Sequence, residues 1–309
     1  MDFAKKLQFI QKQNDKTQTE LAAVFGVSFP TLNSWIQGKS VPRKGAQALI
    51  DALYVEYFGD VKAISFSAEK ESARLKSWQE KYKDPQNFIT SQKDIYDSFV
   101  LSMTYHTNSI EGSTFNEPEV RAVLFDDVTI PNKTVQEHQE AKNHQAALGF
   151  VMRCLRDDKK AITASLIKKI HFILMNGILH NAGQFRTHRV RIVGSHVTTS
   201  NPARIYSDMN EFVKKLTRKL PKEDVVAHIA YTHAMFEQIH PFSDGNGRVG
   251  RLIMLILALQ NNLAPILIQK EKKLAYYKYL QEAQLKGNYT PLIAFMYDAL
   301  FEGYNLLDR

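Results

Sequence analysis

The sequence predicts a mainly helical protein with one small β-hairpin and a small helical unit at its N-terminal end. Three observations carry this prediction. From about Asp94 onward, apolar residues recur three and four positions apart in successive segments, which is the spacing of an amphipathic helix. Residues 189–199, R-V-R-I-V-G-S-H-V-T-T, alternate β-branched and polar residues around a Gly-Ser pair, which predicts a hairpin. Residues 1–58 contain short helical patterns that glycines interrupt.

The helical spacing also sets the order of the elements and the domain boundaries. We expect a small domain at 1–58, a linker or packed surface helix at 59–93, and a main helical domain at 94–309. Residues 59–93 are less periodic and carry mixed charge, which distinguishes them from their neighbours. The helices of the main domain are predicted at 94–104, 117–125, 137–155, 165–176, 205–220, 223–239, 248–260, 273–285 and 290–306.

Composition limits the classes of partner and compartment. The 309 residues carry a net charge of +8, which favours an anionic partner: a nucleic acid, a nucleotide or an acidic protein. The single cysteine, Cys154, excludes an internal disulfide and favours a reducing compartment. The first residues lack the apolar core of a signal peptide, and the longest apolar run, 252–259, is far shorter than the roughly 20 residues that span a bilayer. We therefore expect a soluble cytoplasmic protein without a membrane partner.

Residues 240–251, H-P-F-S-D-G-N-G-R-V-G-R, combine groups that bind a polyphosphate. The G-N-G run at 245–247 tolerates positive φ, so its amide N–H groups can form a concave anion nest. The helix that begins near Arg248 adds the positive end of its dipole. Arg248 and Arg251 are three residues apart, on one helix face, and their planar side chains suit phosphate oxygens. This convergence predicts a phosphate site.

The same segment also contains groups for catalysis. Asp244 lies at the lip of the nest, where a carboxylate repels phosphate unless a cation such as Mg²⁺ lies between them. The ordinary pKa of His240, which precedes a proline at a helix end, suits the removal of a hydroxyl proton near neutral pH. A Gly-rich turn or a lone histidine is usually structural. The combination within twelve positions nevertheless predicts a nucleotidyl-transfer site.

This segment matches in full the signature H-x-F-x-[DE]-G-N-G-R-x-x-R, and it therefore resembles the Fic family, whose members transfer AMP from ATP to a hydroxyl side chain of a target protein. The resemblance covers about residues 94–309 and implies a Fic-type helical bundle, ATP as substrate and Mg²⁺ as cofactor. The family's kinases carry a lysine-containing variant of G-N-G, which is not found here. The resemblance implies these roles: general base His240, loop anchor Phe242, Mg²⁺ ligand Asp244, nucleotide-binding Gly245, Asn246, Gly247 and Arg248, and γ-phosphate contact Arg251.

Two other segments resemble parts of the same family. G-Q-F-R-T-H-R-V-R-I-V-G-S-H-V is similar to the segment that leads into the family's flap, a hairpin whose open edge captures a target by strand addition. A-Y-Y-K-Y-L-Q-E-A-Q-L-K is similar to the helix that borders the adenine. A surface hairpin without a ligand and a core tyrosine pair are the alternatives. The resemblance implies nucleotide contacts from Val193, Gly194, Ser195, His196, Tyr276 and Tyr277.

An inhibitory motif precedes the catalytic one. Residues 107–112, T-N-S-I-E-G, taken alone form a helix C-cap pattern that ends at Gly112. They also resemble the family's inhibitory motif [ST]-x-x-x-E-[GN], which implies that Glu111 pairs with Arg251. The carboxylate would then occupy the guanidinium group that the γ-phosphate needs. The position of the motif resembles the subclass with an N-terminal inhibitory helix.

The N-terminal unit carries a separate signal. The stretch T-Q-T-E-L-A-A-V-F-G-V-S-F-P-T-L-N-S-W-I-Q-G-K-S-V-P-R looks like a helix-turn-helix of the phage-repressor type, with Ser28 as a helix cap and Pro30 in the first turn. Its apolar positions Val27, Leu32 and Trp35 are expected to face the core. A helical scaffold that binds protein or nothing is the alternative. The resemblance implies that the second helix presents Phe29, Thr31, Asn33 and Ser34 to a DNA major groove.

These observations predict an autoinhibited protein adenylyltransferase that modifies a Tyr, Thr or Ser hydroxyl of a target protein or of itself, and that carries a DNA-binding module. The alternative from another class is a transcriptional regulator whose Fic domain senses ATP, although a sensor would not require His240. Transfer of a different phosphate-linked group, and removal of AMP with Glu111 positioning water, are further alternatives. A homodimer is compatible with the sequence, which carries no specific signal for it.

Overall fold

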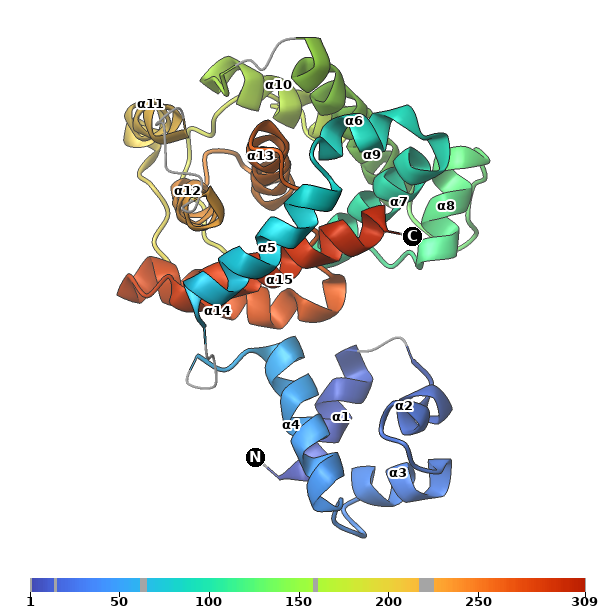
Figure 1. The fold of residues 1–309 in the computed structure, drawn as a ribbon. Coiled ribbons are helices and arrows are strands. Elements are labelled where there is room, and N and C mark those ends of the chain that lie inside the picture. Colours follow the sequence, from blue (N-terminus) through green and yellow to red (C-terminus); the bar gives the residue numbers. More distant parts are fainter. Residues whose placement is uncertain (1, 14–15, 62–65, 158–160, 217–224, 309) are drawn as a thin grey trace. The chain divides into compact units, whose positions relative to one another are not determined.

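The computed structural model describes residues 2–13, 16–61, 66–157, 161–216 and 225–308 (Figure 1). The described residues divide by their internal contacts into two units: those within 1–65 and 271–279, and those within 66–270 and 280–308. Every regular element assigned in these ranges is a helix, which confirms the predicted mainly helical class. The predicted helical residues 217–220 and 223–224 lie outside the described residues.

The first unit is a small helical domain with its own core. Its helices are α1 (Phe3–Gln13), α2 (Gln18–Val24), α3 (Phe29–Ile36) and α4 (Lys44–Phe58). Thr17 caps α2 through a reciprocal pair of hydrogen bonds with Glu20, which satisfies amide groups that a helix start leaves free. The buried residues at the centre of this unit are Leu7, Ile10, Leu21, Ala22, Phe25, Leu32, Trp35, Ile36 and Ile50.

The turn between α2 and α3 follows the sequence prediction. Gly26 has φ of 64°, a left-handed conformation that glycine adopts without strain. The Ser28 side chain accepts a hydrogen bond from the Thr31 amide, and Pro30 lies in the first turn of α3. Leu32 and Trp35 are buried, as expected. The exposed side of α3 therefore carries Phe29 and the partly exposed Thr31, Asn33 and Ser34.

The second unit surrounds one apolar helix, α13 (Asn246–Gln260). All of its residues from Arg248 to Leu259 are buried, and it contacts α7, α9, α10 and α12 (Figure 1). The other helices of this unit cover its flanks. They are α5 (Ala68–Lys81), α6 (Pro85–Ser91), α7 (Lys93–Glu111), α8 (Glu117–Phe125), α9 (Val135–Asp157), α10 (Ala164–Met175), α11 (Ile205–Leu216), α12 (Val225–Ile239), α15 (Thr290–Leu307) and the end of α14 (Lys273–Lys286).

The segment predicted as a linker or a packed surface helix contains α5, which packs against α15. The ring of Trp78 stacks on Tyr304 with centroids 5.3 Å apart, and the Arg74 guanidinium lies 3.8 Å from the centre of the Phe301 ring. The Tyr82 hydroxyl donates to Asp308 at 2.6 Å. These contacts support the packed-helix alternative for residues 68–81.

The predicted β-hairpin at 189–199 needs a correction. A turn is present, because the Ser195 amide donates to the Ile192 carbonyl at 3.1 Å, but none of these residues is assigned to a strand. The two arms are joined instead by a side-chain bond from Thr199 Oγ1 to the Val190 carbonyl at 2.9 Å. A two-stranded ribbon has little stability alone, so these arms depend on side-chain anchors rather than on a backbone ladder.

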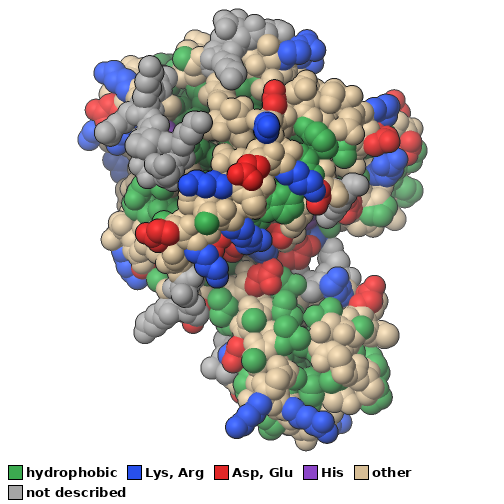
Figure 2. All heavy atoms as spheres, viewed as in Figure 1, with side chains coloured by type: hydrophobic (Ala, Val, Ile, Leu, Met, Phe, Trp, Pro, Cys, Tyr) green, Lys and Arg blue, Asp and Glu red, His purple; other side chains and the backbone are tan. Residues whose placement is uncertain are grey.

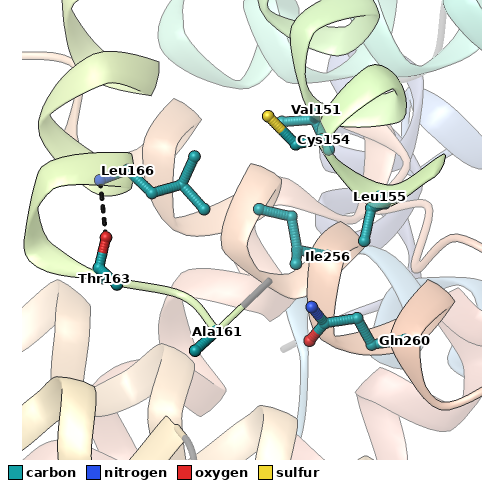
Figure 3. Close-up of a pocket in the computed structure, with 8 residues that line it drawn as sticks. All are labelled: Val151, Cys154, Leu155, Ala161, Thr163, Leu166, Ile256 and Gln260. Atoms are coloured by element: carbon teal, nitrogen blue, oxygen red, sulfur yellow. Dashed lines mark hydrogen bonds between the residues drawn. The ribbon is translucent and has the colours of Figure 1, made fainter. Parts of the chain in front are cut away.

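The surface carries no single charged field on the face shown in Figure 2, where basic and acidic side chains alternate over the second unit. Among the described residues, no helix combines the length and apolar character needed to cross a membrane. A cavity of about 260 Å³ lies between α9, α13 and the start of α10, lined by apolar side chains with Cys154 and Gln260 (Figure 3). It uses none of the residues at 240–251, so it is separate from the predicted site.

Candidate active site

The start of α13 has the conformation of an anion nest. Gly245 precedes the helix with φ of 76°, and a Cβ at this position would lie 2.8 Å from Met175 Sδ. Both the left-handed backbone and the close approach of Met175 therefore require glycine. The first amides of α13 have no partner within the helix, and the helix dipole is positive at this end. The sequence prediction of a glycine-led helix start is in agreement with this geometry.

Asn246 has a different place from the predicted one. Its side chain is buried and forms two hydrogen bonds with the backbone of Phe242, accepting from the amide and donating to the carbonyl, each at 2.9 Å. The side chain therefore closes the loop 242–246, and a phosphate contact by this residue would come from its backbone amide. Phe242 is fully buried, which agrees with its expected role as the loop anchor.

His171 on α10 supports the loop, although the sequence analysis did not select it. Its ring stacks on Phe242 with centroids 3.8 Å apart and planes within 2°. Its Nδ1 accepts from the Gly183 amide at 2.8 Å, so Nε2 carries the proton and donates to the Asp244 carbonyl at 3.0 Å. Burial lowers the pKa of His171 to about 4, which keeps this ring neutral. A lone histidine on an apolar helix face gave no sequence signal for this role.

His240 follows the last residue of α12 in a left-handed conformation with φ of 51°. Such a conformation is uncommon for a residue with a side chain and persists only where the surroundings fix it. The ring lies with Nδ1 3.1 Å from the Glu237 carbonyl, so Nδ1 donates there and Nε2 stays available as a proton acceptor. The side chain is 18% exposed, and burial lowers the pKa of His240. This arrangement suits a general base.

Arg186 fixes the backbone at His240 and is a second residue that the sequence analysis missed. Its guanidinium is buried and donates to the carbonyls of His240 at 2.7 Å, His188 at 2.6 Å, Ser200 at 2.7 Å and Ile239 at 3.3 Å. One side chain thus joins the base of both flap arms to the residue after α12. The fixed fork of five N–H donors explains why arginine suits this position.

The flap residues themselves stay apart from any printed contact with the motif. Val193 is fully exposed, and Gly194 has φ of 74° in the turn. The arms border a concave volume of about 590 Å³ that is lined by 189–191 and 195–201, including Ser195 and His196. A nucleotide contact from these residues stays a prediction.

Asp244 and Arg248 form a charged group at the nest. The Asp244 carboxylate is 59% exposed, and its Oδ2 lies 3.8 Å from Arg248 Nη2. Arg248 is buried, and its Nη1 lies 3.2 Å from Oε1 of Glu140 on α9. Burial of an arginine requires such a partner, which the sequence analysis did not identify. The exposed oxygens of Asp244 are the type of ligand that Mg²⁺ prefers, and one carboxylate completed by substrate phosphates is a usual Mg²⁺ site.

Arg251 connects the motif to the end of α7. Its Nη2 forms an ion pair with Glu111 Oε1, and its Nε donates to the hydroxyl of Thr107. Gly112 ends α7 with φ of 109°, as the C-cap pattern predicts. A Cβ at Gly247 would overlap Oε1 of Glu111, so this carboxylate lies directly over the first turn of α13. The structure thus brings Glu111 and Arg251 together.

The tyrosine pair belongs to the residues of the first unit. Tyr276 is buried, Tyr277 is 37% exposed, and their ring centroids are 5.1 Å apart. Their predicted contact with adenine stays a prediction. His233, predicted as a packing histidine, is buried on α12, and burial lowers its pKa to about 3.

Residues 161–258, which include the whole motif and its supporting histidine and arginine, match the model of the Fic/DOC family. The chain therefore contains a Fic domain. Protein adenylyltransferase Fic of Aedes aegypti is 33% identical over 210 residues, which cover 67% of this chain and 41% of the relative. Protein adenylyltransferase Fic of Nematostella vectensis is 33% identical over 195 residues, which cover 62% of this chain and 45% of the relative. The chain thus spans about two fifths of the length of the curated relatives it matches.

Solved structures show the same fold. Fic-1 from C. elegans superposes with a TM-score of 0.66 at 23% identity, covering 86% of this chain and 78% of that protein. A Fic family protein from Desulfovibrio desulfuricans has a TM-score of 0.65 at 21% identity, covering 79% and 74%. At these identities the comparison concerns the fold, and it supports the predicted Fic-type helical bundle.

The role of Arg186 in this Fic domain leads to a prediction about Arg186→Lys. A lysine keeps the charge but cannot donate to four carbonyls at once, so the flap arms and the backbone at His240 should loosen. We expect a loss of about 2–4 kcal/mol in unfolding free energy, and faster amide hydrogen exchange at 188–200. Arg204→Lys, at a side chain that is 75% exposed, is the matched control. Equal exchange rates in both variants would contradict this role.

Proposed function

We propose that the chain is an autoinhibited protein adenylyltransferase that transfers AMP from ATP to a Tyr, Thr or Ser hydroxyl of a target protein or of itself. The observation that carries the proposal is the joint placement of a base, an anion nest and a carboxylate-paired arginine within one helix start. The names of the relatives support the type of reaction, and the match at 161–258 contains the reacting groups.

His240 would perform the proton transfer. Because Nδ1 donates to the Glu237 carbonyl, Nε2 can take the proton of the target hydroxyl. The hydroxyl oxygen then bonds to the α-phosphorus of ATP, the bond from that phosphorus to the bridging oxygen breaks, and pyrophosphate leaves. The lowered pKa of His240 keeps the imidazole neutral near pH 7, as this step requires.

The start of α13 would hold the phosphates. Its free amides and dipole attract the anion without a charged side chain, and Gly247 leaves room for a close approach of the backbone. Asp244 would hold Mg²⁺ together with the phosphates. When bound, Mg²⁺ would neutralise phosphate charge and favour the departure of pyrophosphate.

Glu111 would inhibit the reaction by occupying Arg251. The γ-phosphate needs the same guanidinium group, and Glu111 Oε1 also covers Gly247. A hydrogen bond to a charged group contributes about 1.5–3 kcal/mol, so removal of Glu111 should raise the rate roughly 10- to 150-fold. The flap arms at 189–200 would hold an extended target segment beside His240 through their unpaired backbone groups.

The direct test follows α-labelled and γ-labelled ATP into protein with Mg²⁺ for wild type, Glu111→Gly and Glu111→Gly/His240→Ala. We expect α-label in Glu111→Gly, little in wild type, and a decrease of about 10²- to 10⁴-fold when His240 is removed, because a general base is lost. Ser109→Gly is the matched control for a glycine in the last turn of α7, since Ser109 does not contact Arg251.

Two results would contradict the proposal. Transfer of γ-label alone would indicate a kinase. No transfer by any variant, even with cell lysate as the source of targets, would favour a transcriptional regulator whose Fic domain senses ATP.

A second proposed function is DNA binding by the first unit as a helix-turn-helix. The exposed side of α3 presents Phe29, Thr31 and Asn33, and the neighbouring α3–α4 loop carries Lys39 and Arg43. Figure 2 shows basic side chains at the end of the first unit where this loop lies. Such charges would contact phosphates, while the short polar side chains of α3 would reach base edges.

Fluorescence anisotropy with a labelled random-sequence duplex tests this second function in the full chain. We expect affinity to fall with salt, and the log–log slope to decrease by about 0.9 for each lost phosphate contact in Arg43→Gln. Lys12→Gln, on the exposed surface of α1, is the control. An unchanged slope in Arg43→Gln, or an equal change in Lys12→Gln, would argue against phosphate contacts from the α3–α4 loop.

A further inference from the structure

Glu237 places a buried carboxyl group beside the proposed catalytic base. It lies one turn before His240, at the end of α12, and its side chain is 8% exposed. Its Oε2 is 3.9 Å from Nδ1 of His240, the ring nitrogen that donates to the Glu237 carbonyl. The mechanism proposed above uses the backbone of Glu237 and leaves this carboxyl without a role.

The packing around this carboxyl is specific. Glu237 Oε1 is buried and has no hydrogen-bond partner in the structure. It lies against the backbone of α13, where a Cβ at Gly250 would come within 2.5 Å of it. The same Cβ would lie 3.0 Å from the ring of His233. A buried carboxyl without a hydrogen bond is costly, and a functional role is one reason for its presence.

Four charged or titratable groups act on Glu237 from the elements around it. They are His233 and His240 on or next to α12, Arg251 on α13 and Glu111 at the end of α7. Burial raises the pKa of Glu237 to about 8, the charge of Arg251 lowers it, and the charge of Glu111 raises it. At neutral pH the buried group is therefore a neutral acid while Glu111 is in place.

Removal of Glu111 changes this balance. The negative charge that disfavours a second carboxylate leaves, and the charge of Arg251 is no longer neutralised by its partner. Both changes favour loss of one proton from Glu237 to solvent. The resulting carboxylate lies beside the Nδ1–H of His240, the position from which a carboxylate fixes the tautomer of a catalytic histidine.

We propose that Glu237 is a positioning residue for His240 that is a neutral acid while Glu111 occupies Arg251 and a carboxylate after Glu111 has left. Release of the inhibitory contact would thereby also strengthen the base. The inference rests on the proposed function, because it assigns His240 as the base and Glu111 as the inhibitor. It adds a second effect of Glu111 that acts through charge rather than through occupation of the phosphate site.

A double-mutant cycle tests the proposal by NMR titration of the His240 ring in four proteins: wild type, Glu237→Gln, Glu111→Gly and the double variant. In the Glu111→Gly background the carboxylate should raise the pKa of His240, so Glu237→Gln should lower it by about one pH unit. In the Glu111-containing background Glu237 is neutral, and Glu237→Gln should have little effect. Loss of the direct charge of Glu111 cancels, because each comparison keeps residue 111 constant.

A second measurement does not depend on a variant at position 237. The carboxyl carbon of Glu237, observed in ¹³C-glutamate-labelled protein, should titrate near pH 8 in wild type and at lower pH in Glu111→Gly. Glu117→Gln, on the exposed first turn of α8, is the control and should leave the titration of His240 unchanged. Equal effects of Glu237→Gln in both backgrounds, or one titration of Glu237 in both, would overturn the proposal.

The outcome is distinguishable from failure of the proposed function. These titrations need neither ATP nor AMP transfer, so a protein that transfers no label can still show the coupling, and an active one can lack it. Where label transfer is observed, a merely structural role of Glu237 would lower the rate equally at all pH values. A positioning role predicts that Glu237→Gln in the Glu111→Gly background moves the acidic limb of the pH–rate profile to lower pH.

Discussion

Two arginines buried on one apolar helix constrain the whole second unit. Arg248 and Arg251 are each at most 5% exposed, and a buried guanidinium is tolerated only with a charged partner and hydrogen bonds. Glu140 on α9 pairs with the first, and Glu111 on α7 pairs with the second. Three helices distant in sequence are therefore held at the start of α13, and their carboxylates converge on the amides that form the anion nest.

The same charges determine the state of the buried titratable groups around them. His144 on α9 bonds to Thr104 and lies near both arginines; burial and their charges lower its pKa to about 3. The ring therefore stays neutral at neutral pH. Buried histidines are kept neutral beside the arginines, whereas the buried acid Glu237 keeps its proton. The centre of the domain thus carries few net charges apart from those of the ion pairs, and a change in one ion pair affects its neighbours.

The sequence was sufficient for the parts of the site that are contiguous. The motif at 240–251 predicted the base, the nest and both arginines, and T-N-S-I-E-G predicted the partner of Arg251 through resemblance. The helical spacing predicted the helices of the second unit to within a few residues at most ends, although α7 extends to Glu111 beyond the predicted 94–104.

The remaining parts depend on contacts that no local pattern reveals. Arg186 and His171 act on the backbone of the motif from other elements, and a lone arginine or histidine has many alternative explanations. The backbone ladder predicted at 189–199 is missing because alternation specifies which side chains share a face, while these arms are joined through Arg186 and Thr199. The Asn246 side chain is directed to Phe242 because a buried amide must satisfy both of its polar atoms.

The central claim is that Glu111 and the γ-phosphate compete for Arg251. Calorimetric titration of wild type and Glu111→Gly with ATP and with ADP, both with Mg²⁺, tests it most directly. ADP lacks the γ-phosphate, so the account predicts that removal of Glu111 increases the affinity for ATP much more than the affinity for ADP. An equal gain for both nucleotides would contradict the claim, because Glu111 would then act on the nest as a whole and not on the γ-phosphate contact.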